Sequence, residues 1–401
     1  GHGDRLRIHW ECIVVQIILA LVLGLAMLSA LASGCAPTGE SGGGQSSPAV
    51  STGSNTSYTI ATNNFGAGVY PLDTNAAYEQ NAADALGVTL NVTNNEFTAD
   101  KSITQLQNQL ASAPDGVAFL GISETLFPVA AQYCKNAETP YVFFACAPKD
   151  EDVAAFEQDE YYVGTVVYSP QGEGAGIAEL ALADGCKTAV ISAGASGDYA
   201  HDRRIIGFTE AFEAGGGEVL FVSHSADPSE GVQKTNDLLT AYPDVDCVYA
   251  CGNDYVAPAA DVVKSRGLEG CKIYGADISP NICQLIMDGE VEACSGGVFA
   301  SCGVAITLLV NYLDGNVIKD SEGKAPYFDS LELFTVTSDN AEDFYKFLSD
   351  EALSTHTISD EEYQNLLVRN NAEVNYDYYV DFMANYAENV YAKVEANANR
   401  A

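Results

Sequence analysis

The segment GVAFL at residues 116–120 is apolar throughout, and the segment YVFFA at residues 141–145 repeats this character after one intervening stretch of helical length. Short, fully apolar runs of this kind are typical of strands that are buried on both faces. Residues 125–136 between them predict a helix. A strand, a helix and a second buried strand in this order predict parallel strands in a sheet that helices cover on both sides.

The same alternation extends in both directions along the chain. Upstream, residues 58–62 and 88–92 predict strands, and residues 75–86 and 101–111 predict helices. The alternation then starts again downstream. Strands are expected there at residues 189–192, 219–222, 247–250 and 272–275, and helices at residues 203–213, 233–240, 256–265 and 281–288. Two successive α/β units of similar plan predict two lobes.

Polar, small or turn-forming residues follow the predicted strands. Open parallel sheets bind ligands at the carboxyl ends of their strands. Two facing lobes would bring these ends together in one cleft, which is where a ligand site is expected. These ends are residues 63–65, 121–123, 145–146, 193–195, 252–254 and 276–277.

The N-terminus has the features of an export signal. Arg5 and Arg7 precede a nearly unbroken apolar run at residues 13–31, and small residues follow. This order predicts a secretory signal peptide, although the run is also long enough for an uncleaved membrane-spanning helix. The segment LASGC at residues 31–35 resembles the bacterial lipobox, which implies cleavage after residue 34 and lipidation of Cys35. Residues 36–56 are rich in Gly and Ser and predict a flexible tether.

Charge and cysteine content exclude several classes of function. The 401 residues include 18 Lys and Arg against 55 Asp and Glu, a net charge of −37, which argues against nucleic acid as a partner. Nine further cysteines are scattered and odd in number, so we predict neither a disulfide framework nor a zinc site. We expect these cysteines to be buried as small hydrophobic residues. No cofactor and no metal are expected. The nine are Cys134, Cys146, Cys186, Cys247, Cys251, Cys271, Cys283, Cys294 and Cys302.

Short motifs in a consistent order resemble the type I periplasmic binding proteins of the ribose-binding class, which are solute receptors of ABC importers. The resemblance covers residues 57–337. The motifs are Asn63-Asn64, ALGV at residues 85–88, DGV at 115–117, YPDV at 242–245, GND at 252–254 with Ala257, YGAD at 274–277, and a helix at 303–313 followed by Asp314-Gly315.

The resemblance implies two Rossmann-like lobes joined by three hinge crossings. Lobe 1 is expected at residues 57–160 and 297–327, and lobe 2 at residues 161–296 and 328–337. Residues 338–401 exceed what this fold needs and predict a C-terminal extension of acidic, Tyr-rich helices. In the family, a ligand closes the lobes and the closed form docks on permease subunits. We expect a monomer.

The resemblance also implies ligand-contacting residues. Asn64 and Phe65 match the family's first-strand loop, whose aromatic residues sandwich a sugar ring, and Tyr70 is an alternative to Phe65. Asn253 and Asp277 match an Asn and an Asp that bind hydroxyl groups. Capping of a helix N-terminus is the alternative role for both.

Several of the family's sugar contacts are replaced. The position of its Asp-Arg pair lies in the uncharged stretch FACAP at residues 144–148, which offers Phe144. A family Arg aligns with Asp202, near Tyr199, and a family Gln aligns with Gly297, next to Phe299. These replacements favour a sugar-like solute that is less polar or differently shaped.

The sequence contains no nucleophile–base–orienter set, so we do not expect an enzyme. The leading hypothesis is a lipid-anchored extracytoplasmic receptor that delivers a small solute to an ABC importer. A sensory receptor that reports ligand binding to a membrane signalling partner is the alternative, and an exported enzyme is a third. The Gly-rich stretch at residues 172–176 lacks the spacing of a phosphate-binding loop and predicts close helix packing instead.

Overall fold

The computed structural model describes residues 57–68 and 72–400. Residues 56–401 form one compact unit. The predicted signal peptide, the tether, Cys35 and Tyr70 lie outside the described residues.

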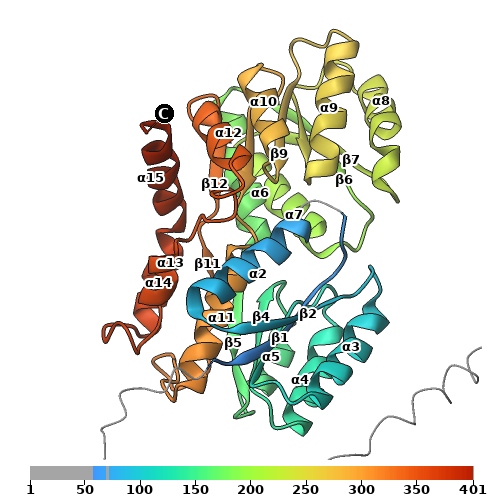
Figure 1. Ribbon diagram of the computed structural model, residues 1–401. Coiled ribbons are helices and arrows are strands. Elements are labelled where there is room, and N and C mark those ends of the chain that lie inside the picture. Colours follow the sequence, from blue (N-terminus) through green and yellow to red (C-terminus); the bar gives the residue numbers. More distant parts are fainter. Residues whose placement is uncertain (1–56, 69–71, 401) are drawn as a thin grey trace, which may run out of the picture. The chain divides into compact units, whose positions relative to one another are not determined.

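The first sheet has six parallel strands in the order β11-β5-β4-β3-β1-β2 (Figure 1). The predicted buried strands, β3 and β4, lie in its middle, and every residue in them is buried. The expected alternation of strands and helices is therefore confirmed. The strands are β1 (Thr59–Asn64), β2 (Thr89–Asn94), β3 (Gly116–Phe119), β4 (Tyr141–Ala145), β5 (Tyr162–Tyr168) and β11 (Tyr327–Leu331).

Helices cover both faces of this sheet. Helices α2 (Leu72–Leu86) and α11 (Ala300–Leu313) pack against each other on one face. Helices α3 (Ala99–Ala111), α4 (Leu126–Asn136) and α5 (Asp150–Phe156) belong to the other face. Neighbouring strand residues divide between the two sides, since Ile60 and Ala118 join one hydrophobic cluster and Ala61 and Val117 the other.

The second sheet also has six strands, in the order β12-β10-β9-β8-β6-β7. All neighbours are parallel except the β10–β12 pair, which is antiparallel. The strands are β6 (Thr188–Ala193), β7 (Glu218–His224), β8 (Cys247–Ala250), β9 (Lys272–Ala276), β10 (Ala293–Gly296) and β12 (Phe334–Thr337). The helices are α6 (Pro170–Ala183), α7 (Tyr199–Ala214), α8 (Gly231–Ala241), α9 (Asn253–Ser265) and α10 (Pro280–Met287).

The Gly-rich stretch allows α6 and α7 to approach closely. A Cβ added at Gly174 would collide with the Arg204 backbone oxygen, and one at Gly207 with the Gln171 backbone oxygen. The expected role in helix packing is confirmed.

The chain passes between the two sheets three times: from β5 to α6, from β10 to α11, and from β11 to β12. Two of these crossings differ from the boundaries expected at residues 160/161 and 327/328. Strand β5 pairs with β4, and β11 pairs with β5, so both lie in the first sheet. The reason is that β5 is a further fully buried run, YVGTVVY, which extends the first sheet before the chain leaves it.

The predicted C-terminal extension is helical and contacts both lobes (Figure 1). On lobe 1, α13 packs against α2 and α14 against β11; on lobe 2, α12 packs against α10 and α15 against β12. The helices are α12 (Ala341–Ser349), α13 (Asp360–Asn365), α14 (Tyr376–Ala384) and α15 (Tyr386–Ala398).

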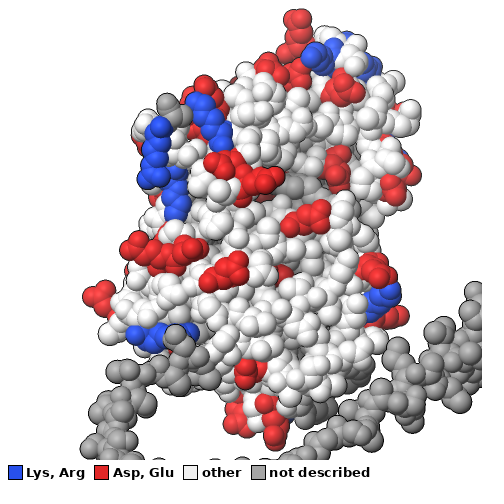
Figure 2. Space-filling model, in the orientation of Figure 1, with Lys and Arg blue, Asp and Glu red and all other residues white. Residues whose placement is uncertain are grey.

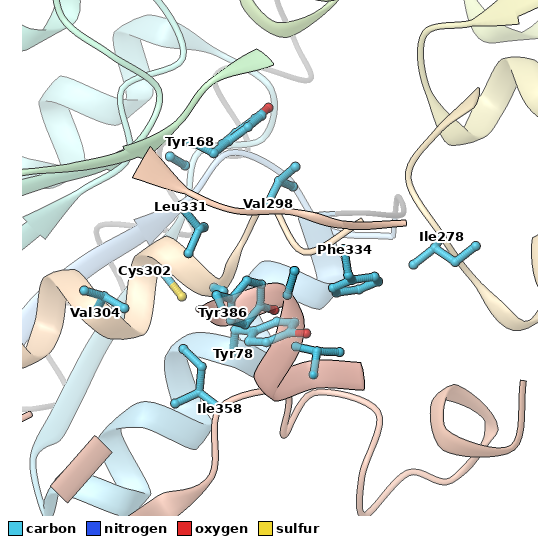
Figure 3. Close-up of a cluster of buried hydrophobic side chains, with 14 of the residues drawn as sticks. Tyr78, Tyr168, Ile278, Val298, Cys302, Val304, Leu331, Phe334, Ile358 and Tyr386 are labelled. Atoms are coloured by element: carbon cyan, nitrogen blue, oxygen red, sulfur yellow. The ribbon is translucent and has the colours of Figure 1, made fainter. Parts of the chain in front are cut away.

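The extension also joins the hydrophobic cores of the lobes. One cluster contains Ile60 from lobe 1, Ile273 from lobe 2 and Tyr379 from the extension, whereas two smaller clusters are each confined to a single lobe. Figure 3 shows Tyr78 of α2 close to Tyr386 of the extension within this shared cluster. Burial of apolar surface is the main stabilising term in folding, so the extension contributes to the stability of both lobes.

The surface is strongly acidic. Figure 2 shows Asp and Glu distributed over one face, with few Lys and Arg between them. All nine predicted cysteines are free, and eight of them are buried, as expected for small apolar residues. Within residues 57–68 and 72–400, no helix is long and apolar enough to cross a bilayer.

Candidate functional site

A cavity of about 190 Å³ lies where the lobes, the hinge and the extension meet. Lobe 1 contributes Thr74 and Tyr78, and lobe 2 contributes Asp277 and the residues that follow it. The second hinge crossing contributes the segment from Gly296 to Phe299. The site therefore lies at the carboxyl ends of β9 and β10, as the fold class predicted for a ligand cleft.

Arg204 is the central charged group beneath this cleft. Its side chain is only 4% exposed and forms an ion pair with the fully buried Glu173 carboxylate of α6. It also donates to the Cys251 backbone oxygen at 2.8 Å. Burial disfavours the charged form, but the carboxylates of Glu173 and Asp277 outweigh it and hold the Arg204 pKa above its usual range. Arg204 is therefore a permanent cation inside lobe 2.

Asp277 is held in one position by three features. An Oδ1 atom lies 3.7 Å from Arg204 Nη2, and Oδ2 accepts a 3.3 Å hydrogen bond from the Asn253 backbone N–H. The backbone of Asp277 has φ of 73°, a left-handed conformation that Asp tolerates better than most residues. Because a carboxylate has about four acceptor positions, Asp277 retains acceptors for a ligand at the cavity wall.

The Asn253 backbone N–H belongs to the first turn of α9, so Asp277 caps that helix from another strand's loop. The N-cap residues of α9 and α10 are Gly252 and Ser279, so neither Asn253 nor Asp277 caps the helix that follows its own strand. The Asn253 side chain is half-buried at the same edge of the sheet. Asn253 and Asp277 lie side by side because they follow neighbouring parallel strands. Their contact with a ligand remains a prediction.

His201 lies beside Asp277 in its neutral form. Its Nδ1 accepts a 2.9 Å hydrogen bond from the Gly194 backbone N–H, so the proton resides on Nε2. Burial lowers the pKa of His201. A Cβ at Gly252 would lie 2.9 Å from His201 Nε2 and 3.9 Å from Asp277 Oδ2, so only glycine leaves room for this approach.

Tyr199 and Asp202 both lie in the first turn of α7. The Tyr199 hydroxyl accepts a 3.0 Å hydrogen bond from the Ala147 backbone N–H of lobe 1, and Arg203 stacks over its ring. Arg203 also pairs with Glu124 of lobe 1 at 2.6 Å. Asp202 accepts from the Gly197 backbone N–H at 2.8 Å and so holds the loop before α7.

The predicted lobe 1 residues have different environments. Asn64 is 5% exposed and donates to the backbone oxygens of Gly66 and Leu72, so its amide shapes the loop that carries Phe65. Phe65 is half-buried and contacts Phe97 edge-on at 5.6 Å between ring centroids. Phe144 is fully buried in the core, so the structure offers a ligand no access to its ring.

Phe299 lines the cavity at the start of α11, and its contact with a ligand remains a prediction. Neighbouring Gly297 has φ of 105° and no room for a side chain, because a Cβ would lie 2.8 Å from the Tyr386 ring and 2.9 Å from the Phe334 ring. A side chain such as the Gln that the resemblance implies at this position would therefore collide with the rings of Tyr386 and Phe334.

The residues that sequence reasoning missed are chiefly Arg204 and Glu173. Arg203 and Arg204 are adjacent on α7, and neighbouring helical residues point about 100° apart. The choice between them needs the orientation of the helix, which the charge pattern alone does not give. On α6, Glu173 lies among small and apolar residues such as Gly174 and Ile177, a pattern typical of a buried helix face. An acidic residue on a buried face predicts a buried cationic partner.

No cluster of three or more His, Cys, Asp or Glu within the described part of the chain could hold a metal ion. The buried charges at the cleft are paired with one another, and the residues near them form no nucleophile–base pair. The arrangement can hold and orient a small polar molecule.

The comparisons with known proteins agree with this geometry. The model of the periplasmic binding protein domain family matches residues 75–316. Among curated proteins, the ribose import binding protein RbsB of Salmonella typhimurium is 24% identical over 221 residues, which cover 53% of this chain and 70% of that protein.

Solved structures share the fold. A galactofuranose binding protein superposes with a TM-score of 0.64 at 18% identity, over 74% of this chain and 99% of that chain. The glucose-galactose binding protein GanP of Geobacillus stearothermophilus gives a TM-score of 0.60 at 18% identity, over 71% and 99% of the two chains. With two sheets, three crossings and a match over most of both lobes, the chain belongs to the periplasmic binding protein family and is of the type I, ribose-binding-like kind that its motifs predicted.

Proposed function

We propose that this chain is an extracytoplasmic solute-binding protein of an ABC importer, which captures a sugar or sugar-like molecule between its lobes. The observation that carries the proposal is the Asp277 carboxylate, fixed by Arg204 and the Asn253 backbone and set in the wall of an inter-lobe cavity. Hydroxyl groups of a sugar are suitable donors to such a carboxylate. Membership of a family of solute receptors supports the same role.

The composition of the cavity favours a ring with one polar edge and one apolar face. Asp277, Ser279 and Thr74 offer hydrogen bonds, whereas Phe299 and Phe334 offer aromatic surface. Relatives of similar fold carry names that refer to ribose, arabinofuranose and galactofuranose. The uncharged segment at Ala145 and Cys146 supports a solute with fewer hydroxyl contacts on the lobe 1 side.

Attachment to the membrane through Cys35 is part of the proposal. The lipobox-like segment and the Gly/Ser tether of residues 36–56 support it, since a tethered receptor is held at high effective concentration beside its permease. Metabolic labelling with a fatty acid tests it: the full chain should incorporate label in a bacterial host, and the Cys35→Ser variant should not. Label in the variant would contradict the lipidation of Cys35.

Thermal-shift measurements on residues 36–401 test the binding function. The panel is D-ribose, L-arabinose, D-galactose, D-allose and myo-inositol. A sugar that binds should raise the melting temperature in proportion to the logarithm of its concentration, and Asp277→Asn should abolish the shift. The exposed Asp84→Asn substitution is the matched control and should behave as wild type. If no sugar of the panel stabilises the wild-type chain, the proposal fails.

A further inference from the structure

We infer that the C-terminal extension forms one wall of the solute cavity and helps to select a single-ring solute; this inference rests on the proposed function. The family fold needs only residues 57–337, so this wall is built by residues that lie outside that fold. The extension contributes Leu348 from the end of α12, and Ser354 and Thr355 from the turn that follows it.

The position of this wall complements the rest of the cavity. Asp277 lies on the lobe 2 side, Tyr78 on the lobe 1 side, and Phe299 on the hinge. Leu348 adds apolar surface, and the Ser354 hydroxyl adds one donor and two acceptor positions. The wall therefore supplies both kinds of contact that a sugar ring uses, an apolar face and hydrogen-bonding groups.

The extension also occupies space at the hinge. Gly297 cannot carry a side chain because the Tyr386 ring of the extension and the Phe334 ring would collide with it. The family places a Gln there. The hinge therefore presents no side chain at this position, and the Phe334 ring of β12 lines the cavity beside it.

Two anchors keep the wall in place. Asn81 of α2 hydrogen-bonds to the Thr355 side chain and, at 3.1 Å, to the Thr355 backbone oxygen. Two residues later, Thr357 donates to the Tyr78 hydroxyl at 3.0 Å and accepts from the Tyr386 hydroxyl at 2.8 Å. These bonds are buried or partly buried, so the turn that carries Ser354 and Thr355 has a defined position against lobe 1.

The volume of the cavity limits the size of the solute. At about 190 Å³ the cavity is small, which suits one monosaccharide or cyclic polyol rather than an oligosaccharide. Because the wall closes this side, a second sugar unit cannot extend past Leu348 and Ser354. We therefore assign selection of a single ring to the extension.

Isothermal titration calorimetry on residues 36–401 tests the inference, with the sugars of the thermal-shift panel and with maltose as the two-ring probe. The variants are Leu348→Trp and Ser354→Leu, which fill the cavity. The control is Tyr345→Trp on the same helix α12, where the side chain is 37% exposed and outside the cavity. We expect each cavity variant to weaken binding of a monosaccharide by about tenfold or more, and the control to leave it unchanged. Wild type should not bind maltose.

The outcomes separate this inference from the proposed function. Wild type that binds a monosaccharide, together with folded cavity variants of unchanged affinity, overturns the role of the extension and leaves the binding function intact. Binding of maltose with affinity equal to that of a monosaccharide also overturns it. Absence of binding by every sugar to wild type overturns both proposals. Circular dichroism identifies a variant that does not fold, and the second cavity variant then decides.

Discussion

Glu79 is a carboxylic acid enclosed inside lobe 1. Glu79 Oε1 accepts hydrogen bonds from Asn75 Nδ2 at 2.9 Å and from the Thr62 hydroxyl at 3.4 Å. Glu79 Oε2 and Asn75 Oδ1 are buried without a hydrogen-bond partner. Burial raises the pKa of Glu79 from 4.5 to about 8. The folded protein therefore keeps a proton on Glu79 at neutral pH, and the unfolded chain does not.

This difference predicts the pH dependence of stability. Below about pH 4.5 both states are protonated, and the contribution of Glu79 is fully present. As the pH rises to about 8, only the unfolded state has lost the proton, so the free energy of unfolding falls by up to about 5 kcal/mol. Above that pH the contribution is constant. In urea unfolding of Glu79→Gln, the free energy of unfolding should no longer decline between pH 4.5 and 8, because a neutral amide of the same shape has no proton to lose.

The control for this prediction is Glu361→Gln at an exposed position, which should retain the wild-type pH dependence. An unchanged decline in Glu79→Gln would show that another group titrates.

At the scale of elements, the extension is joined to lobe 1 by polar contacts inside an apolar cluster. The chain of hydroxyls from Tyr78 through Thr357 to Tyr386 connects α2 with the start of α15. A second connection runs from Asn311 of α11 to the Leu366 backbone oxygen and the Tyr379 hydroxyl, each at 2.9 Å. Buried polar groups fix one arrangement of helices, because any shift would leave them without partners.

The substitution Thr357→Val tests the first connection. Valine has nearly the same shape, but it leaves the Tyr78 and Tyr386 hydroxyls without this partner. The free energy of unfolding should fall by about 1–3 kcal/mol. In a double-mutant cycle with Tyr78→Phe, the two losses should not add, since the same hydrogen bond is removed twice. Additive losses would contradict a direct coupling between the two residues.

At the scale of the whole molecule, the extension contributes to a core that both lobes share. Residues such as Leu366, Tyr379 and Val390 are fully or almost fully buried against the lobes. Removing residues 338–401 would expose the facing sides of α2, α10 and α11. An apolar patch of this kind promotes aggregation.

We therefore expect the chain ending at residue 337 to be expanded or insoluble, even though the family fold is complete by that point. Dye binding to exposed apolar surface and near-ultraviolet circular dichroism would measure this, with residues 36–401 as the reference. A truncated chain that is soluble, monomeric and cooperatively folded would show that the extension is dispensable for folding.

The sequence predicted much of the fold because apolar runs and helical periodicity are local signals. Strands β3 and β4 were identified from single segments, and the family motifs then supplied the order of the lobes. Strand β5 was missed, and with it the first crossing, because the pairing of YVGTVVY with β4 is a non-local contact. Asp277 and Phe299, which the family motifs pointed to, both line the cavity, and their contact with a ligand stays a prediction. Identification of Arg204 required the orientation of α7, and the contacts of the extension required the packing of distant segments.

The two flanks of the cleft are unequal. The extension covers the flank of α2 and α11, whereas the flank at α5 has a hollow of about 440 Å³ that Glu124, Lys149 and Tyr327 line. Because the extension packs over the first flank, we expect a solute to enter and leave on the second. Beside this hollow, Arg203 of α7 pairs with Glu124, the Tyr199 hydroxyl accepts from the Ala147 backbone N–H, and Arg204 donates to the Tyr168 hydroxyl at 3.5 Å. On this expectation, opening of the lobes on that side breaks the contacts that Tyr199 and Arg203 of α7 make with lobe 1.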